Sequence, residues 1–264
     1  MTRKRKGFDP AEANAWSEEC ARAQAAFDAA RARRTPDAFE KTARALTAND
    51  LLVGLPAPSP PTHACLCGEP CWRPGLCVGC TDKQARVRQA LEETTRSIPA
   101  EYAWAHFGAL ELLSRLSGDT RAIAAAREAV GAEGVVLLGP SGSGKTALGV
   151  CVLRARARRT TTPGVFLFAT RLGVARVQAP FGSGEAPMVA EAMRADLALL
   201  DDLGSERDAK DGAMVDIIFA RHAAKRWTVA TSGFSRDDIV RRYGDGCARR
   251  LTERAVVIEL GSGA

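Results

Sequence analysis

Residues 139–146 read Gly139-Pro140-Ser141-Gly142-Ser143-Gly144-Lys145-Thr146, which matches the G-x-x-x-x-G-K-[ST] pattern of a phosphate-binding loop. The apolar run 135–138 comes directly before the loop and predicts a buried strand, and a helix is predicted over 146–156. Glycines let backbone N–H groups turn inward around phosphates, and the N-terminus of the following helix adds partial positive charge. The loop and its flanks therefore predict a nucleoside triphosphate site.

A magnesium ion is expected beside this loop. Lys145 should contact the β- and γ-phosphates, and Thr146 should place its hydroxyl on the ion. A magnesium site also needs a carboxylate at the end of a neighbouring strand, where the chain has Asp201-Asp202. We expect Asp201 to hold magnesium, directly or from the second shell, and Asp202 to orient or deprotonate the attacking water. Glu206 is a weaker candidate for the base.

Strands and helices are predicted to alternate around the loop. Strands are expected over 135–138, 165–168, 196–200, 228–231 and 255–260, and helices over 146–156 and 214–225. Continuous apolar strands are typical of a parallel sheet that helices cover on both faces. Upstream, apolar residues at three-residue steps from Trp104 to Leu116 predict an amphipathic helical lead-in. The predicted fold class is therefore α/β, with a P-loop parallel sheet flanked by helices.

The composition limits the class of protein. The chain has 264 residues and a formal net charge of +6. A positive balance is compatible with a nucleic-acid partner, although a solvated basic surface explains it equally well. No stretch approaches the roughly 20 apolar residues of a membrane span, and the N-terminus lacks the apolar run of a secretory signal. We therefore expect no membrane contact and a cytoplasmic location.

Four parts follow one another along the chain. Residues 1–54 are rich in Ala, Arg and Glu and predict a helical N-terminal region. Residues 55–62 carry a proline run that predicts a stiff linker. A cysteine-rich segment and a helix are expected over 63–97, and the P-loop domain over 98–264.

Five of the eight cysteines crowd between Cys65 and Cys80, which favours a metal site over a disulfide framework. Cys77 and Cys80 form one half-site, and we place the other half at Cys67 and Cys71, with Cys65 and Cys67 as the main alternative. Four thiolates would make a structural zinc site that folds a segment with almost no core of its own. Reduced cysteines without metal, or a redox or cluster site, are the remaining interpretations. A small zinc module can bind DNA or dock a protein.

Three segments carry a family resemblance. Residues 201–207, DDLGSER, resemble the DDLGxE segment of DnaC/IstB-type AAA+ ATPases, and residues 234–244 look like that family's LSPEEL…RYG segment. Residues 98–107 look like its lead-in before the first strand. The resemblance implies a RecA-like sheet and ATP hydrolysis coupled to assembly on nucleic acid. Because the chain ends soon after the last predicted strand, we expect the helical lid of larger AAA+ proteins to be missing.

Two positions depart from the family pattern. Alignment on the RYG segment puts Gly233 where the family usually carries a polar sensor asparagine, for which Thr231 or Ser232 could substitute. The same alignment puts Gly246 at the usual position of the trans-acting arginine finger.

Arginines close to Gly246 offer a replacement for the finger. Arg250 matches a second family arginine, and in a helix over 246–252 both Arg249 and Arg250 lie on nearly the same face as Gly246. We expect Arg250 to act from this shifted position; the alternative is ordinary surface charge. Since an arginine finger contributes about 10³ or more in rate, the departures affect turnover more than binding.

Three functions remain open. The resemblance first implies an ATPase that assembles a replicative helicase on single-stranded DNA, with ATP-dependent self-association of this chain. It equally implies a helper ATPase that activates a transposase. The two departures suggest instead a nucleotide-gated DNA- or protein-binding adaptor that hydrolyses ATP poorly. A small-molecule kinase is disfavoured, because the chain shows no acceptor-binding motif.

Overall fold

The computed structural model describes residues 63–65, 67, 70–71, 76–180, 182–206 and 212–261. The predicted helical N-terminal region, residues 1–54, and the predicted linker, residues 55–62, lie outside the described residues. Everything described belongs to one compact unit that begins at Pro61.

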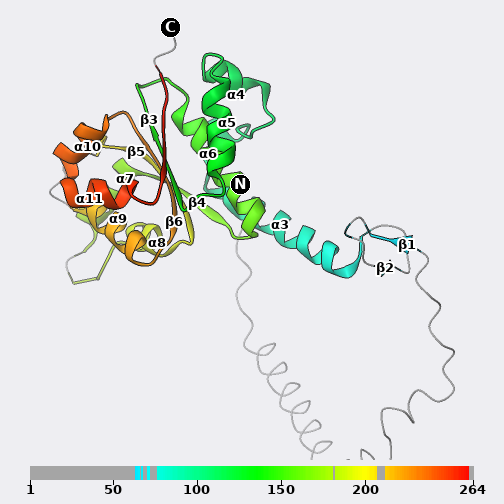
Figure 1. The fold of residues 1–264 in the computed structure, drawn as a ribbon. Coiled ribbons are helices and arrows are strands. Elements are labelled where there is room, and N and C mark those ends of the chain that lie inside the picture. Colours follow the sequence, from blue (N-terminus) through cyan, green and yellow to red (C-terminus); the bar gives the residue numbers. More distant parts are fainter. Residues whose placement is uncertain are drawn as a thin grey trace, which may run out of the picture. The chain divides into compact units, whose positions relative to one another are not determined.

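Five parallel strands form the central sheet, in the order β4-β5-β6-β3-β7 (Figure 1). Their bounds are β3 Gly134–Leu138, β4 Gly164–Phe168, β5 Leu197–Leu203, β6 Trp227–Ser232 and β7 Val256–Glu259. All five predicted strands are confirmed, and the main difference is that β5 continues through Asp201 and Asp202. The P-loop strand β3 lies inside the sheet between β6 and β7, and it is buried along its whole length.

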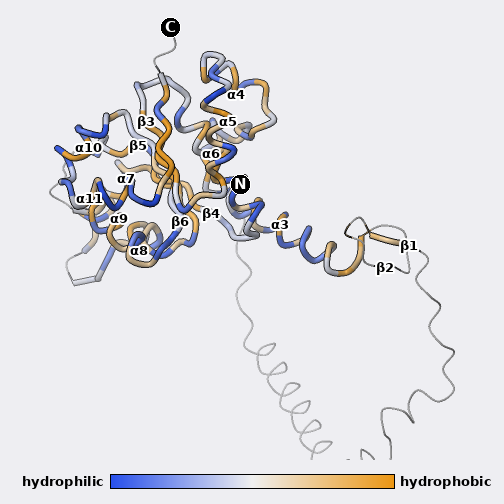
Figure 2. Tube along the Cα trace, in the orientation of Figure 1, coloured by the Kyte–Doolittle hydropathy of each residue, from blue (hydrophilic) through white to orange (hydrophobic). Residues whose placement is uncertain are grey.

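Helices cover both faces of the sheet. Their bounds are α3 Val78–Ser97, α4 Leu110–Arg115, α5 Thr120–Ala129, α6 Lys145–Thr160, α7 Ala169–Gln178, α8 Pro187–Arg194, α9 Ala213–Ala223, α10 Arg236–Tyr243 and α11 Asp245–Thr252. One apolar core lies under α5 and α6, and the other lies under α7 to α11. The strands between these cores are apolar (Figure 2). This three-layer arrangement confirms the predicted α/β class.

The lead-in departs from the predicted continuous helix. A short 3₁₀ turn, η1 Ala100–Tyr102, comes first, and the six-residue α4 follows after a bend. His106 Nδ1 accepts a hydrogen bond of 3.1 Å from the Gly108 N–H, which closes a tight turn where the helix was expected. Leu110 is consequently 92% exposed, whereas Leu116 is buried beside the P-loop.

The cysteine-rich segment holds two short antiparallel strands, β1 His63–Ala64 and β2 Pro70–Cys71. Helix α3 begins directly after Cys77, which is its N-cap. At its other end, Thr94 Oγ1 accepts a hydrogen bond of 2.9 Å from the Gly164 N–H at the start of β4. None of the described helices combines the length and apolarity needed to cross a membrane.

Candidate functional site: a phosphate-binding loop with a paired aspartate

The loop at 139–144 is packed closely from both sides. Gly139 has a φ of +147°, and a Cβ there would lie 2.5 Å from the Leu260 carbonyl oxygen at the end of β7. Gly144 has a φ of +81°, and a Cβ there would lie 2.9 Å from the Arg115 carbonyl oxygen at the end of α4. Both positions require glycine, because a side chain would clash with backbone and the φ values are unfavourable for other residues.

Ser143 provides an independent sign of a ligand in this loop. Its Oγ is buried and has no hydrogen-bond partner within the described part of the chain. An unpaired buried hydroxyl costs free energy unless a ligand or water supplies an acceptor. A phosphate oxygen in the loop would be such an acceptor, so the residues present fit a bound nucleotide.

Lys145 begins α6 and is only 8% exposed. Its Nζ donates a hydrogen bond of 2.7 Å to the Pro140 carbonyl oxygen, so the side chain folds back over the loop. Burial lowers the pKa of this lysine, while the nearby carboxylates of Asp202 and Asp201 act in the opposite direction. A phosphate anion would compensate the buried charge, which is the role predicted for Lys145.

A bulge in β5 determines how the paired aspartates, Asp201 and Asp202, are oriented. Leu200 pairs with Ala230 and Leu203 with Ser232, so two residues of β5 oppose the single Thr231 of β6. Asp202 adopts a φ of +61°, which is unusual for a residue other than glycine. Asp201 is buried and Asp202 is exposed. The bulge therefore gives two adjacent carboxylates two different environments at the carboxyl edge of the sheet.

Thr231 connects both aspartates. Its hydroxyl donates to Asp201 Oδ1 over 2.7 Å and accepts from the Asp202 N–H over 2.9 Å. Burial raises the pKa of Asp201, and hydrogen bonds from the Thr231 and Thr146 hydroxyls partly offset this. Asp201 and Thr146 thus lie together where a magnesium ion would need them, and a cation would relieve the buried carboxylate.

Tyr102 is a site residue that the sequence analysis did not single out. Its hydroxyl interacts with the Thr146 side chain, and its ring lies 6.4 Å from the Phe166 ring in a stacked pair. Burial raises its pKa. A lone aromatic residue in the lead-in carries no signal of this contact, because the lead-in reaches the loop only through tertiary packing.

Glu206 is not a free base. Its side chain is buried and accepts hydrogen bonds from the Tyr243 hydroxyl, from Arg242 Nε at 3.3 Å and from the Gly204 N–H at 3.0 Å. Arg242 also donates to the Glu206 carbonyl oxygen. These contacts tie the segment after β5 to α10. The DDLGSE and RYG segments therefore meet in space, with Glu206 as their common point.

The usual sensor position offers no side chain. A Cβ on Gly233 would meet nothing within 4 Å, so the space next to it is open. Ser232 Oγ donates 2.7 Å to the Leu203 carbonyl oxygen, and Thr231 is engaged by the aspartates. Both hydroxyls, which the sequence offered as substitutes for the asparagine, thus connect β5 with β6.

Arg250 lies on α11, as the predicted helix over 246–252 requires. Its Nη1 donates 2.8 Å to the Gly246 carbonyl oxygen, and its guanidinium lies over the Phe219 ring at 4.1 Å from the centroid. Its charged group therefore lies beside Gly246. Arg249 is more exposed and pairs with Glu253 at 3.6 Å.

Four cysteines come together in the N-terminal segment. The sulfurs of Cys65, Cys67, Cys77 and Cys80 all lie within 4.8 Å of one another, and those of Cys67 and Cys77 are 3.6 Å apart. Sulfurs around a tetrahedral zinc, with Zn–S near 2.3 Å, are about 3.8 Å apart, so this donor set fits zinc. The cluster corresponds to the alternative pairing of Cys65 with Cys67. The side chain of Cys71, which our first choice included, lies outside the described residues.

Comparison with known proteins supports the fold. No protein-family model and no curated relative matches the sequence. Among solved structures, the DnaC helicase loader is 21% identical, with a TM-score of 0.54 over 61% of this chain and 99% of that one. DnaI is 20% identical, with a TM-score of 0.51 over 62% and 94%. A candidate primosome component from Streptococcus pyogenes serotype M3 is 21% identical, with a TM-score of 0.51 over 67% and 96%.

Proposed function

From the AAA+ fold shared with DnaC-type helicase loaders, we propose that this chain is a cytoplasmic magnesium-dependent ATPase. We further propose that it couples ATP to the assembly of a replicative helicase on single-stranded DNA. The observation that carries the proposal is the loop at 139–146 facing Asp201 and Asp202, with the Ser143 hydroxyl buried and unpaired within the described residues. The partners follow from the fold likeness and the basic charge.

Different residues of the site bind the phosphates, hold magnesium and orient water in this proposal. The loop N–H groups and Ser143 contact phosphate oxygens, and Lys145 exchanges the Pro140 carbonyl for the β- and γ-phosphates. Thr146 and Asp201 hold magnesium, which neutralises phosphate charge when it is bound. Asp202, exposed and aimed by the bulge, orients the attacking water and accepts its proton.

Arg250 acts in trans in this proposal. An ATP-dependent homo-oligomer would bring it to the nucleotide of a neighbouring copy, where it stabilises transition-state charge. Its hydrogen bond to Gly246 and its stacking on Phe219 position the guanidinium beside the residue that takes the place of the usual finger.

Zinc has a structural role in the proposal. Cys65, Cys67, Cys77 and Cys80 hold one ion, which fixes the start of α3 through the Cys77 N-cap. With four protein ligands the ion has no open position for chemistry. The module then serves to dock a protein partner or DNA.

Gly233 favours a second candidate function. Without a polar side chain at the sensor position, hydrolysis is slowed and the chain would act as a nucleotide-gated adaptor. A helper ATPase for a transposase is the further alternative, and it would assemble on double-stranded DNA.

Binding of labelled DNA by the full chain tests these proposals. Fluorescence anisotropy is measured with magnesium and ATP, a non-hydrolysable ATP analogue, ADP or no nucleotide, on single- and double-stranded oligonucleotides of equal length. A loader binds single-stranded DNA at least about 10-fold more tightly with the ATP analogue than with ADP, and Lys145→Ala removes the difference. Preference for double-stranded DNA supports the transposition helper. A DNA affinity that does not depend on the nucleotide contradicts the loader, the transposition helper and an adaptor that binds DNA.

A further inference from the structure

A second cavity lies at the amino-terminal ends of β3 and β6, whereas the P-loop follows the carboxyl end of β3. It has a volume of about 290 Å³ and includes Gly134 and Trp227, which begin β3 and β6. The loop at 139–146 follows the other end of β3. The cavity is therefore separate from the nucleotide site, and of its lining residues the proposed function uses Arg250 alone, whose guanidinium lies over the Phe219 ring.

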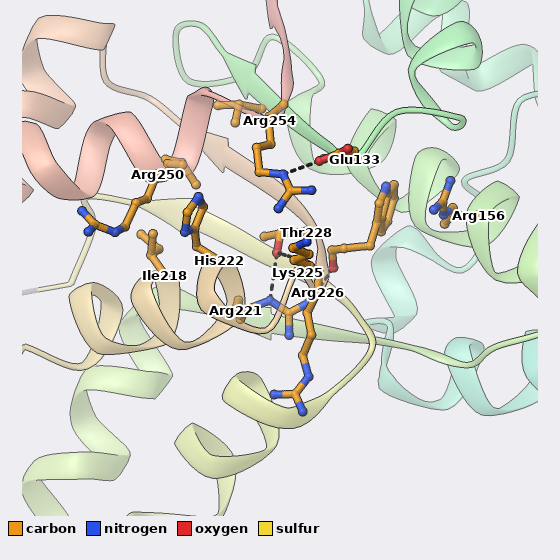
Figure 3. A pocket seen from close by; sticks show the side chains of 15 residues that line it. Glu133, Arg156, Ile218, Arg221, His222, Lys225, Arg226, Thr228, Arg250 and Arg254 are labelled. Carbon is orange, nitrogen blue, oxygen red and sulfur yellow. Dashed lines mark hydrogen bonds and ion pairs between the residues drawn. The ribbon is translucent and has the colours of Figure 1, made fainter.

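Its lining is strongly cationic (Figure 3). Six permanently charged residues line it: Arg156, Arg221, Lys225, Arg226, Arg250 and Arg254. They come from α6, from the end of α9 and from α11 with the turn after it. Glu133 is the one carboxylate in the lining, within the part of the chain that the structure describes.

Nearby acids do not neutralise this charge. Glu133 pairs with Arg254, while Glu253 and Asp196 act on the cluster from just outside the lining. The C-terminus of α9 adds roughly half a negative charge. Six cations therefore face three carboxylates, and a positive excess of about two charges remains.

Arg221 shows that burial of positive charge in this cavity is energetically unfavourable. It is 1% exposed, and its hydrogen bonds go to backbone carbonyls and to Thr228 Oγ1, not to a carboxylate. Burial, together with the charge of Arg226, lowers the pKa of Arg221 to about 10. Asp196 offsets part of this charge without contacting the guanidinium, and a bound anion would compensate the rest.

Several donors in the lining remain available. Arg156 Nε is buried and has no hydrogen-bond partner within the described residues, while its guanidinium lies over the Trp227 ring and its Nη1 donates to the Val130 carbonyl oxygen, so this arginine adds charge more than free donors. Lys225 is exposed, and Arg226 uses one Nη atom, on the Met193 carbonyl oxygen. Arginine forks and a lysine ammonium are the groups that proteins use to bind phosphate oxygens.

We propose that this cavity is a second anion site, which takes a small phosphorylated molecule no larger than about a mononucleotide. The excess of positive charge and the donors that are not fully used favour a ligand with a phosphate group. The volume, at the low end of the range for ligand pockets, selects a small molecule.

Isothermal titration calorimetry with pyrophosphate tests this proposal. The full chain carries Lys145→Ala, so that the P-loop does not contribute, and magnesium is omitted. We expect one equivalent to bind. In the same background Lys225→Gln with Arg226→Gln should weaken binding by about 100-fold, since each of the two lost charge-assisted hydrogen bonds is worth about a factor of ten. The pair Lys225→Arg with Arg226→Lys should retain it.

Two exposed cations on α3 provide the matched control. Lys83→Gln with Arg88→Gln removes the same charge outside the cavity and should change affinity less than about twofold. Absence of saturable binding, or an equal loss in this control, overturns the proposal. Hydrogen exchange with pyrophosphate, in the Lys145→Ala chain alone, should protect residues 220–228 and 250–255. Protection confined to residues 139–146 contradicts the proposal without relying on any cavity variant.

Discussion

At the residue scale, one hydroxyl organises the carboxyl end of β5, where the paired aspartates lie. Thr231 donates to Asp201 and accepts from the Asp202 backbone within a single bulge. One carboxylate is thereby held in the interior beside Thr146, and its neighbour turns outward. The different environments of the two aspartates are thus a consequence of backbone geometry as well as of residue type.

Replacement of Thr231 by valine tests this arrangement. The change keeps the shape but leaves the Asp202 N–H and Asp201 Oδ1 without their partner, which should cost about 1–3 kcal/mol in free energy of unfolding. ATP hydrolysis should fall more than nucleotide affinity, because Asp202 loses its orientation. Thr160→Val, on the exposed end of α6, is the control. Urea denaturation with equal loss in both variants contradicts the role of Thr231.

Asp201 links magnesium binding to pH. Its raised pKa means that the folded chain takes up a proton more readily than the unfolded chain does. The destabilising contribution of the ionised group is therefore fully present above the folded pKa and disappears as pH falls through it. Magnesium needs the ionised form, so magnesium-dependent nucleotide binding should weaken on acidification at a pH above the ordinary aspartate range.

The variant Asp201→Asn separates these two effects. It should lower magnesium affinity by about 10- to 100-fold and remove the acidic part of the pH profile. Without ligands its melting temperature at neutral pH should be equal to or higher than that of the unchanged chain. A lower melting temperature together with unchanged magnesium affinity contradicts the assignment.

At the element scale, Glu206 joins the segment after β5 to α10. Arg242 and Tyr243 both reach its buried carboxylate. Arg242→Ala leaves that carboxylate under-compensated and should cost about 2 kcal/mol or more in stability. Arg241→Ala, one position away, removes a surface pair with Asp238 and should cost less than about 1 kcal/mol. Equal decreases in melting temperature for the two variants would contradict a stabilising role of the Arg242 contact with Glu206.

The elements show what sequence patterns can and cannot predict. The five strands of the parallel sheet and α6 follow from continuous apolar runs, and the loop follows from its glycines, whereas the short strands β1 and β2 were not predicted. The prediction of a helix through the lead-in was wrong. The turn at Gly108 interrupts the segment, although the spacing of its apolar residues is still typical of a helix. The roles of Glu206 and Thr231 differ from those expected, because their partners are far away in the sequence. Glu206 contacts Arg242, which is 36 residues away, and Thr231 contacts Asp202 and Asp201, which are 29 and 30 residues away. Only the folded chain brings such pairs together.

At the scale of the whole molecule, the proposed zinc site would supply the order at the start of α3. The purified chain should carry about one zinc per molecule, and removing it with a chelator should unfold the segment before α3 while the P-loop domain stays folded. Cys65→Ser should lose the metal. Cys71→Ser should retain it, and loss in Cys71→Ser with retention in Cys65→Ser restores our first choice of ligands.

The central claim is that the loop at 139–146 and the paired aspartates form a working ATPase. Steady-state ATP hydrolysis, measured with and without single-stranded DNA, tests it most directly. The unchanged chain should exceed Lys145→Ala and Asp202→Asn by about 100-fold or more, while Asp202→Asn still binds ATP. Arg250→Ala should lose activity and recover part of it when mixed with Lys145→Ala subunits. A rate in the unchanged chain no higher than that of Lys145→Ala would contradict the claim and leave a nucleotide-gated adaptor.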